Sequence, residues 1–256
     1  MHVEQAGDHG PLLLCLHGIG SSSAAFAPQL AALSAHMRVI AWDAPGYGRS
    51  ADPTRPPGLD GYVDTAAALI RRHGGPAHVL GVSWGGVIAL RLAARHPDLV
   101  AGLIVADSSA GSGTDPDRAA AMRRRATDLA DQGPDAFARA RGPRLVSDQA
   151  PPDLVHRVTA TMAAAVRLPG YAWAAESMAT ADLRPQLPTV TAPTLVLCGD
   201  RDQVTGIEAS QLIAGALPTA VFVIVAGAGH LANQERPAAF NAWVHSHLRI
   251  TARIPE

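Results

Sequence analysis

The 256-residue chain contains little cysteine, little net charge and no long apolar run, and each shortage argues against a class of protein. Its two cysteines, Cys15 and Cys198, lie inside apolar segments without the Cys or His neighbours that a metal site requires, so we expect inert core thiols. No stretch approaches the roughly 20 apolar residues of a membrane-spanning helix. We therefore expect neither a metal site nor association with a membrane.

Charge is almost balanced, with 21 basic and 22 acidic residues and a formal net charge of −1. The clustered cations Arg123–Arg125 stand in an alanine-rich helical stretch and predict a solvated helix face, so nucleic-acid binding has little support. The segment Gly18–Gly20 lacks the third glycine of a dinucleotide loop, and we expect no cofactor. No basic and then apolar leader follows Met1, so we expect a cytoplasmic protein. The oligomeric state stays open.

The chain is long enough for one α/β domain, and its 48% of hydrophobic residues suffice for a sheet buried on both faces. Strand and helix patterns alternate from Leu12 to Asp107, resume at Thr194 and end with a helix over Pro237–Leu248. This alternation predicts a doubly wound, mostly parallel sheet formed by residues 1–110 and 189–256. Residues 111–188 lack strand patterns and predict an inserted helical cap, with helices over Asp117–Asp131, Pro134–Ala140, Pro152–Val166 and Gly170–Ala179.

The most informative motif is the pentapeptide Gly-Val-Ser-Trp-Gly at 81–85, between a predicted strand at Ala77–Leu80 and a helical pattern that ends before Pro97. A serine at a tight strand-to-helix turn is held in a strained backbone conformation with its hydroxyl exposed. Bulkier residues at Gly81 and Gly85 would collide with neighbouring elements. The pattern therefore indicates Ser83 as a nucleophile, although the pentapeptide alone also fits an ordinary loop.

A second loop follows the apolar run Leu12–Leu16, where His17-Gly18 opens a stretch of small residues. Such a loop lets backbone N–H groups approach an anion, as an oxyanion hole requires. We expect the two donors to be the backbone amides of Ile19 and of Trp84, directly after the nucleophile. The imidazole of His17 itself is interpreted as a brace for the loop.

A serine nucleophile needs a base, and the base needs a carboxylate to orient it. The chain has eleven histidines. Apart from His17, which is interpreted as a loop brace, only His230 follows a predicted strand, at Val221–Val225, within a loop of small residues. Histidines elsewhere, such as His245 and His247 on the last helix, are interpreted as solvated or structural. His230 is therefore our candidate base.

Two aspartates, Asp200 and Asp202, follow the predicted strand Leu195–Gly199. Asp202 is the preferred acid because the chain must turn after Gly199 before a side chain points at a neighbouring loop. Asp200 is expected to cap that turn through local backbone bonds. Asp107, at the end of the strand Leu103–Ala106, is the reserve.

Together with the segment Asp43–Ser50 (Asp-Ala-Pro-Gly-Tyr-Gly-Arg-Ser), these motifs resemble the α/β-hydrolase superfamily over nearly the whole chain. Within it, the chain looks most like small cofactor-free esterases and lactonases related to 3-oxoadipate enol-lactone hydrolase. The resemblance implies the α/β-hydrolase fold, a triad of Ser83, Asp202 and His230, and oxyanion amides at Ile19 and Trp84. Many of these relatives carry methionine where this chain has Trp84, so we expect a different wall of the acyl pocket.

These roles predict a serine hydrolase that cleaves an ester or lactone of a small, largely apolar acyl substrate through an acyl-enzyme. Within the cap, Trp173 and Met178 are the candidate pocket residues. Two alternatives use the same triad: a carbon–carbon bond hydrolase of a dioxo acid, and a biosynthetic acyltransferase or cyclase. A third alternative is a non-catalytic ligand-binding protein with the hydrolase fold.

Overall fold

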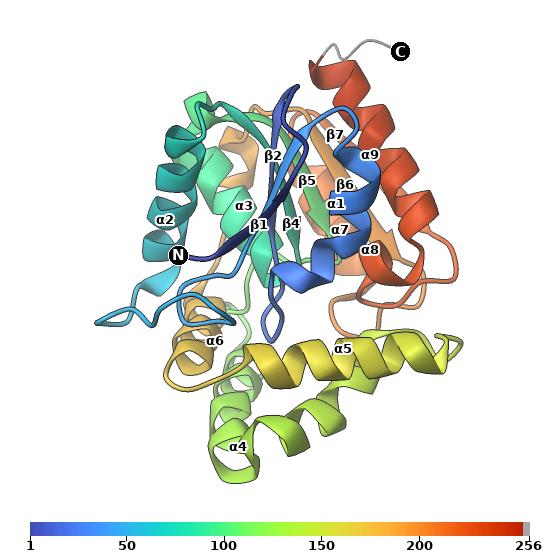
Figure 1. The fold of residues 1–256 in the computed structure, drawn as a ribbon. Helices are drawn as coiled ribbons and strands as arrows, with labels where there is room; N and C mark the ends of the chain where they lie inside the picture. Colours follow the sequence, from blue (N-terminus) through green and yellow to red (C-terminus); the bar gives the residue numbers. More distant parts are fainter. Residues whose placement is uncertain (253–256) are drawn as a thin grey trace.

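A computed structural model describes residues 1–252 and contains one seven-stranded sheet in the order β1-β3-β2-β4-β5-β6-β7 (Figure 1). The six strands from β2 to β7 run parallel, and only the edge strand β1 is antiparallel to its neighbour β3. The strands are β1 (Val3–Ala6), β2 (Leu12–Leu16), β3 (Arg38–Trp42), β4 (Ala77–Val82), β5 (Val100–Ala106), β6 (Thr194–Gly199) and β7 (Ala220–Val225).

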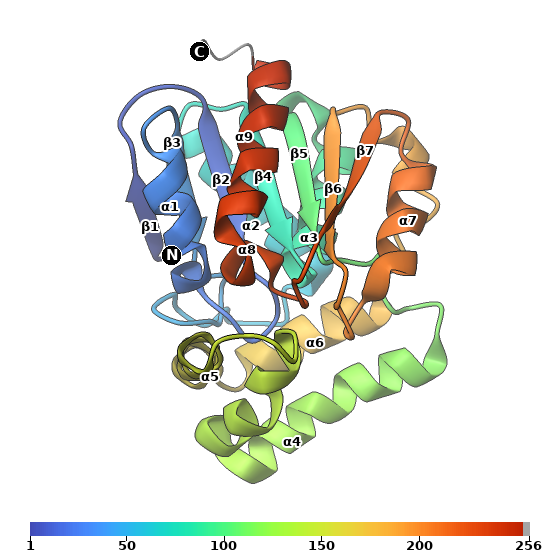
Figure 2. The same ribbon diagram turned by 90° about the vertical axis from the view of Figure 1, so that its right-hand side faces the viewer.

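Helices cover both faces of this sheet, so the fold is the α/β-hydrolase arrangement that the motifs predicted (Figure 2). Side chains from α2, α3 and α7 join one core cluster, and those from α1, α8 and α9 join the cluster on the opposite face. The α-helices are α1 (Ala27–Leu33), α2 (Gly58–Arg72), α3 (Trp84–Arg95), α4 (Pro116–Arg141), α5 (Pro152–Ala165), α6 (Gly170–Thr180), α7 (Gly206–Ala216), α8 (Ala232–Glu235) and α9 (Pro237–Ala252). Short 3-10 helices are η1 (Ser23–Phe26), η2 (Pro97–Leu99), η3 (Gly142–Leu145) and η4 (Leu187–Thr189).

Continuous apolar strands follow from this two-sided burial. Along β2, Leu12, Leu14 and Leu16 enter one core cluster, whereas Leu13 and Cys15 enter the other. Successive side chains of a strand point to opposite faces, so a strand covered on both sides has no solvent-facing position for polar residues. The expectation that Cys15 is a core thiol is confirmed, since the residue is buried and burial raises the pKa of its thiol.

Three long helices, α4, α5 and α6, lie together beyond the end of the sheet where the parallel strands finish (Figures 1 and 2). All three belong to residues 111–188, and their bounds agree with the helices that the sequence pattern predicted. Helix α4 is broken at Gly133, which has a φ of 73° and directly precedes Pro134. The helix therefore consists of the two pieces that the sequence predicted. The treatment of this segment as a separate cap unit stays a prediction. Within residues 1–252, no helix combines the length and apolarity needed to cross a membrane.

Candidate active site

Ser83 occupies the turn between β4 and α3 with a left-handed backbone, φ 55° and ψ −118°. Such a conformation costs a non-glycine residue about 1–3 kcal/mol and persists only when the surroundings enforce it. Here the Ser83 amide donates to the carbonyl of Ala106 on β5 at 2.9 Å, and the Gly86 amide donates to the Ser83 carbonyl at 2.9 Å. The strain expected of a serine at this turn is therefore present.

The two glycines of the pentapeptide are required by close backbone contacts. A Cβ at Gly85 would lie 2.0 Å from the carbonyl oxygen of Leu16 on β2, and one at Gly81 would lie 2.3 Å from the carbonyl oxygen of Gly85. Neither position has room for a side chain, because the atoms that it would meet are backbone. The turn is thus pressed against the neighbouring strand with Ser83 at its apex.

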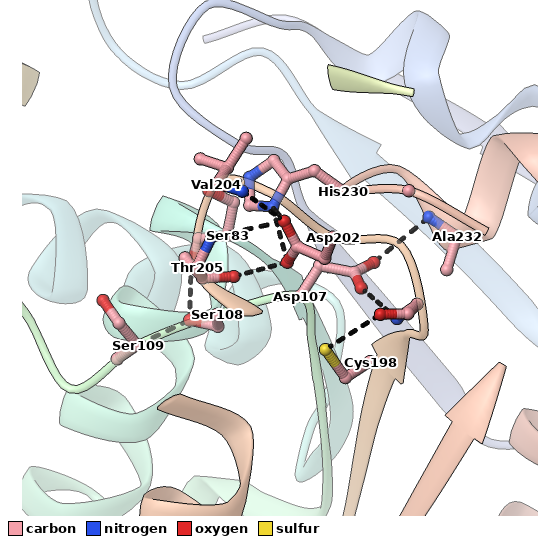
Figure 3. A network of polar contacts seen from close by, with 12 residues as sticks. Ser83, Asp107, Ser108, Ser109, Cys198, Asp202, Val204, Thr205, His230 and Ala232 are labelled. Carbon is pink, nitrogen blue, oxygen red and sulfur yellow. Dashed lines mark hydrogen bonds and ion pairs between the residues drawn. The ribbon is translucent and has the colours of Figure 1, made fainter. Parts of the chain in front are cut away.

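His230 lies in the loop between β7 and α8, and its imidazole reaches Ser83 in the turn between β4 and α3, which we call the nucleophile turn after the role predicted for Ser83 (Figure 3). Its Nε2 is 2.9 Å from Ser83 Oγ, and its Nδ1 is 3.0 and 3.1 Å from the two carboxylate oxygens of Asp202. A carboxylate accepts only, so Nδ1 carries the proton in this pair and Nε2 faces the serine hydroxyl as an acceptor. The structure therefore brings together the three side chains that the sequence analysis selected.

Asp202 is held by more than the histidine. Its carboxylate also accepts from the amides of Val204 and Thr205 at 2.8 and 3.2 Å and from Thr205 Oγ1 at 2.6 Å. Burial by itself would raise the pKa of Asp202, but the hydrogen bond and charge of His230 and the bonds from the 204–205 turn outweigh it and lower that pKa. Asp202 is therefore ionised at neutral pH and suited to orient an imidazole.

The other carboxyl groups near these strand ends have structural roles. Asp200 Oδ1 accepts from the amides of Gly227 and Ala228 at 2.7 and 3.2 Å, so our expectation that it caps its own turn is wrong. Parallel pairing of β6 with β7 brings this neighbouring loop within its reach, and local bonds are not needed. Asp200 thereby supports the loop that carries His230.

Asp107, the reserve acid, is fully buried and also has a left-handed backbone, with φ 48°. It accepts from the amides of Gly199 and Ala232 at 2.8 and 3.1 Å, and burial raises its pKa to about 7. These bonds join the ends of β5 and β6 to the start of α8, while Asp202 makes the contact with the imidazole. Asp107, Cys198 and Asp202 lie close enough to hold an ion, but the carboxylates already accept backbone and imidazole donors, and burial raises the pKa of the Cys198 thiol to about 12. The cluster does not fit a metal site.

His17 braces the loop after β2, as the sequence analysis expected. Its Nδ1 donates to the carbonyl of Gly18 at 2.9 Å, and its Nε2 accepts from the amide of Ala44 at 3.0 Å. Burial lowers the pKa of His17 to about 4, so the ring is neutral at pH 7. A Cβ at Gly18 would lie 3.1 Å from Ser83 Cβ, which places the loop carrying Ile19 directly against Ser83.

Trp84 has a different role from the pocket wall that we expected. Its indole is fully buried and packs edge-on against the ring of Tyr62, with the ring centroids 4.7 Å apart. Its Nε1 donates to Ser177 Oγ on α6 at 3.0 Å. The side chain therefore connects the nucleophile turn to the overlying helix. Its backbone amide lies in the first turn of α3, where N–H groups have no intrahelical acceptor and stay available to an anion.

A cavity of about 220 Å³ opens at Ser83 and His230. Ile19 and Met178 line it, but Trp173 does not, so the prediction for Trp173 is wrong. Tyr171 and Met178, seven residues apart on α6, share the face that meets the cavity, and two residues after Tyr171 the helix has turned Trp173 to the opposite side. Three arginines also line the cavity, although the sequence predicted a largely apolar substrate and a solvated face for Arg125: Arg118, Arg125 and Arg141.

One buried carboxylate was not found by sequence reasoning. Glu235 on α8 accepts from the Gly229 amide at 2.8 Å, from the Ser147 amide at 3.0 Å and from Ser147 Oγ. It thereby ties the backbone beside His230 to the segment between η3 and α5. No motif marks this residue, because its partner Ser147 lies 88 positions earlier in the chain.

Comparison with known proteins places this geometry in a family. Residues 13–243 match the model described as the Alpha/beta hydrolase family, and the chain belongs to that family. It is 29% identical to 3-oxoadipate enol-lactonase 2 of Acinetobacter baylyi, covering 93% of this chain and 89% of that protein. It is 31% identical to 2-(acetamidomethylene)succinate hydrolase of Mesorhizobium japonicum, covering 93% of this chain and 87% of that protein.

Among solved structures, a thermophilic esterase from Thermogutta terrifontis superposes with a TM-score of 0.90 at 29% identity, covering 98% of this chain and 93% of the esterase. The protein is therefore an enzyme of the α/β-hydrolase type, and the resemblance drawn from its motifs is confirmed. The bond that it cleaves is a separate question.

We predict that Gly85→Ala destabilises the protein by about 1–3 kcal/mol, because the new methyl group must push the nucleophile turn away from β2. Urea unfolding followed by circular dichroism measures the change. Gly215→Ala on α7 is the matched control, since its Cβ meets nothing within 4 Å and should leave stability unchanged or slightly raised. Equal stability of the two variants would contradict the contact argument.

Because His17 is buried in its neutral form, we predict that the free energy of unfolding falls in acid. Its pKa is about 4 in the folded protein and 6.5 in an unfolded chain, so the unfolded state takes up the proton first as pH falls. The stabilisation is complete above pH 6.5 and is lost progressively toward pH 4, by up to about 3 kcal/mol. His17→Gln should therefore lose less unfolding free energy than the wild type between pH 7 and pH 4.5. The control His156→Gln changes an exposed histidine and should lose as much unfolding free energy over this pH range as the wild type. An equal loss in His17→Gln would show that His17 is not the source of the pH dependence.

Proposed function

We propose that the protein is a serine hydrolase that cleaves a carboxylic ester or lactone of a small acyl substrate through an acyl-enzyme. One observation carries the proposal: the hydrogen-bonded chain from Ser83 Oγ through the His230 ring to the Asp202 carboxylate, with contacts of 2.9 and 3.0 Å. A nucleophile, a base and an orienting carboxylate in this order are what activation of a serine requires.

The reaction follows from these contacts. His230 Nε2 removes the Ser83 hydroxyl proton while Oγ attacks the substrate carbonyl, and Asp202 stabilises the imidazolium that forms. The amides of Ile19 and Trp84 donate to the oxyanion in this proposal. His230 then gives its proton to the departing alcohol, and a water activated by the same ring releases the acid and restores Ser83.

The site supports hydrolysis of a small molecule in preference to a polymer, because the cavity at Ser83 measures about 220 Å³ and is lined in part by residues of α4, α5 and α6. Names of the relatives agree with this class, since they include a lactonase, an esterase and a hydrolase of a succinate derivative. Carbon–carbon bond cleavage and acyl transfer would use the same three side chains. A screen of esters, lactones and vinylogous diketones separates ester or lactone hydrolysis from carbon–carbon bond cleavage, and repeating it with an added alcohol or amine detects acyl transfer. A burst of chromophore from an activated ester excludes a protein that only binds ligands.

Ser83→Ala should lower kcat/KM for p-nitrophenyl butyrate by about 10⁴- to 10⁶-fold, because only binding and the oxyanion amides remain. Its thermal unfolding should stay close to that of the wild type. Turnover near the wild-type rate in a protein confirmed by mass spectrometry would show that the nucleophile lies elsewhere.

Asp202→Asn should lower kcat by about 10⁴-fold, because the amide favours the wrong tautomer of His230. Asp200→Asn is the matched control: the same chemical change two residues away affects a carboxylate that holds backbone amides and makes no contact with the imidazole. We expect it to cost mainly stability. The reverse ranking in steady-state assays would transfer the orienting role to Asp200.

A further inference from the structure

The cavity beside Ser83 carries an excess of positive charge. Its lining contains three arginines, Arg118, Arg125 and Arg141, and no aspartate or glutamate from the described residues. The whole chain has a net charge of −1, so this concentration is local. Low-dielectric walls around charges of one sign raise the local concentration of the opposite ion.

Two of these arginines lack the partners that neutralise other cations of α4. Arg118 approaches Asp115 at 3.3 Å, and Arg123 forms a two-pronged pair with Glu176 at 2.7 and 2.9 Å. Arg125 and Arg141, by contrast, have no carboxylate within 4.0 Å in the part of the chain that the structure describes. Their charges are left for something else to balance.

Both guanidinium groups are also held in a defined setting. The guanidinium carbon of Arg141 lies 5.6 Å from the centroid of the Phe137 ring. Phe137 packs edge-on against Tyr171, with the ring centroids 5.2 Å apart. Arg125 is half-buried, and its Nη1 lies 3.3 Å from Met122 Sδ. Burial and the nearby charge of Arg141 lower the pKa of Arg125, and the side chain of Tyr171 opposes that shift. An arginine stays protonated under such a shift, so two like charges share one wall of the cavity.

We propose that Arg125 and Arg141 bind a carboxylate group of the substrate, so that the enzyme cleaves esters or lactones that bear a free acid. The inference rests on the proposed function and adds to it the class of substrate. Guanidinium groups match the geometry of a carboxylate, and an anion between the two would relieve their mutual repulsion. Because one cavity joins this pair to Ser83, a small acyl chain can present its ester at one end and its acid at the other.

The test compares two esters of similar length: monomethyl adipate, which carries a carboxylate, and methyl hexanoate, which does not. Hydrolysis is followed in a pH-stat. Arg125→Gln and Arg141→Gln should each lower kcat/KM for monomethyl adipate about ten- to a hundredfold, mainly through KM, and should change that for methyl hexanoate less than about threefold. Arg125→Lys should retain part of the preference, because it keeps the charge but loses the planar fork.

Arg124→Gln is the matched control, since it removes the same charge from the adjacent, exposed position that does not line the cavity. It should leave both substrates unchanged. Equal losses on both esters in the Arg125 and Arg141 variants, or no loss on either, would overturn the proposal. Turnover of the neutral ester also shows that each variant is folded.

A binding measurement separates this proposal from the proposed function. In calorimetric titration of adipate into Ser83→Ala protein, we expect binding that weakens at least about tenfold when Arg125→Gln or Arg141→Gln is added, and that is unaffected by Arg124→Gln. Adipate binding that is absent, or equal in all four proteins, would overturn the carboxylate site. If the binding follows this pattern but no ester is cleaved by the wild type, the proposed function fails and the anion site stands.

Discussion

The left-handed backbone of Ser83 is the constraint on which the site depends. It exists because β4 ends against β5, where the Ala106 carbonyl accepts the Ser83 amide, and because Gly85 lets the turn touch the backbone of β2. Those contacts point the hydroxyl away from the sheet and set the start of α3 behind it. A parallel sheet buried on both faces stabilises such a strained turn, because the strands β2, β4 and β5 fix its surroundings.

Carboxylates at the ends of the strands then place the remaining parts relative to that turn. Asp107 joins the ends of β5 and β6 to the start of α8, Asp200 holds the loop before His230, and Asp202 holds the imidazole itself. Each accepts backbone amides at the carboxyl ends of parallel strands, where loops from distant parts of the chain meet. Glu235 extends this arrangement to Ser147 in the segment between η3 and α5, and Trp84 extends it to Ser177 on α6. Hydrogen bonds therefore connect the surroundings of Ser83 and His230 to the segment that lies over the cavity.

The sequence could predict the parts that follow strands. Ser83, Asp202 and His230 each stand in a turn or loop that follows an apolar run, and parallel strands bring such positions to one edge. The cavity wall could not be predicted in the same way. Trp173 and Met178 looked equivalent as apolar residues, but the face of α6 that meets the cavity is set by packing.

The positive charge of the cavity wall could not be predicted for a similar reason. Arg123–Arg125 reads as one solvated run, yet a helix turns each of its residues by about 100°, so Arg123 pairs outward with Glu176 while Arg125 enters the cavity. Glu235 gave no signal because its contacts cross 88 positions of sequence. Tertiary contacts that no local pattern encodes decide these roles.

Covalent labelling tests the central claim most directly, because the account requires Ser83 Oγ to act as a nucleophile activated by His230. The protein is incubated with a fluorophosphonate, which forms a stable adduct with activated serines, and its peptides are examined by mass spectrometry. The account predicts one adduct per chain, on the peptide containing Ser83, formed in parallel with loss of esterase activity and greatly slowed in His230→Gln. Full inactivation with the label on another residue, or labelling of Ser83 at the same rate without His230, would contradict it.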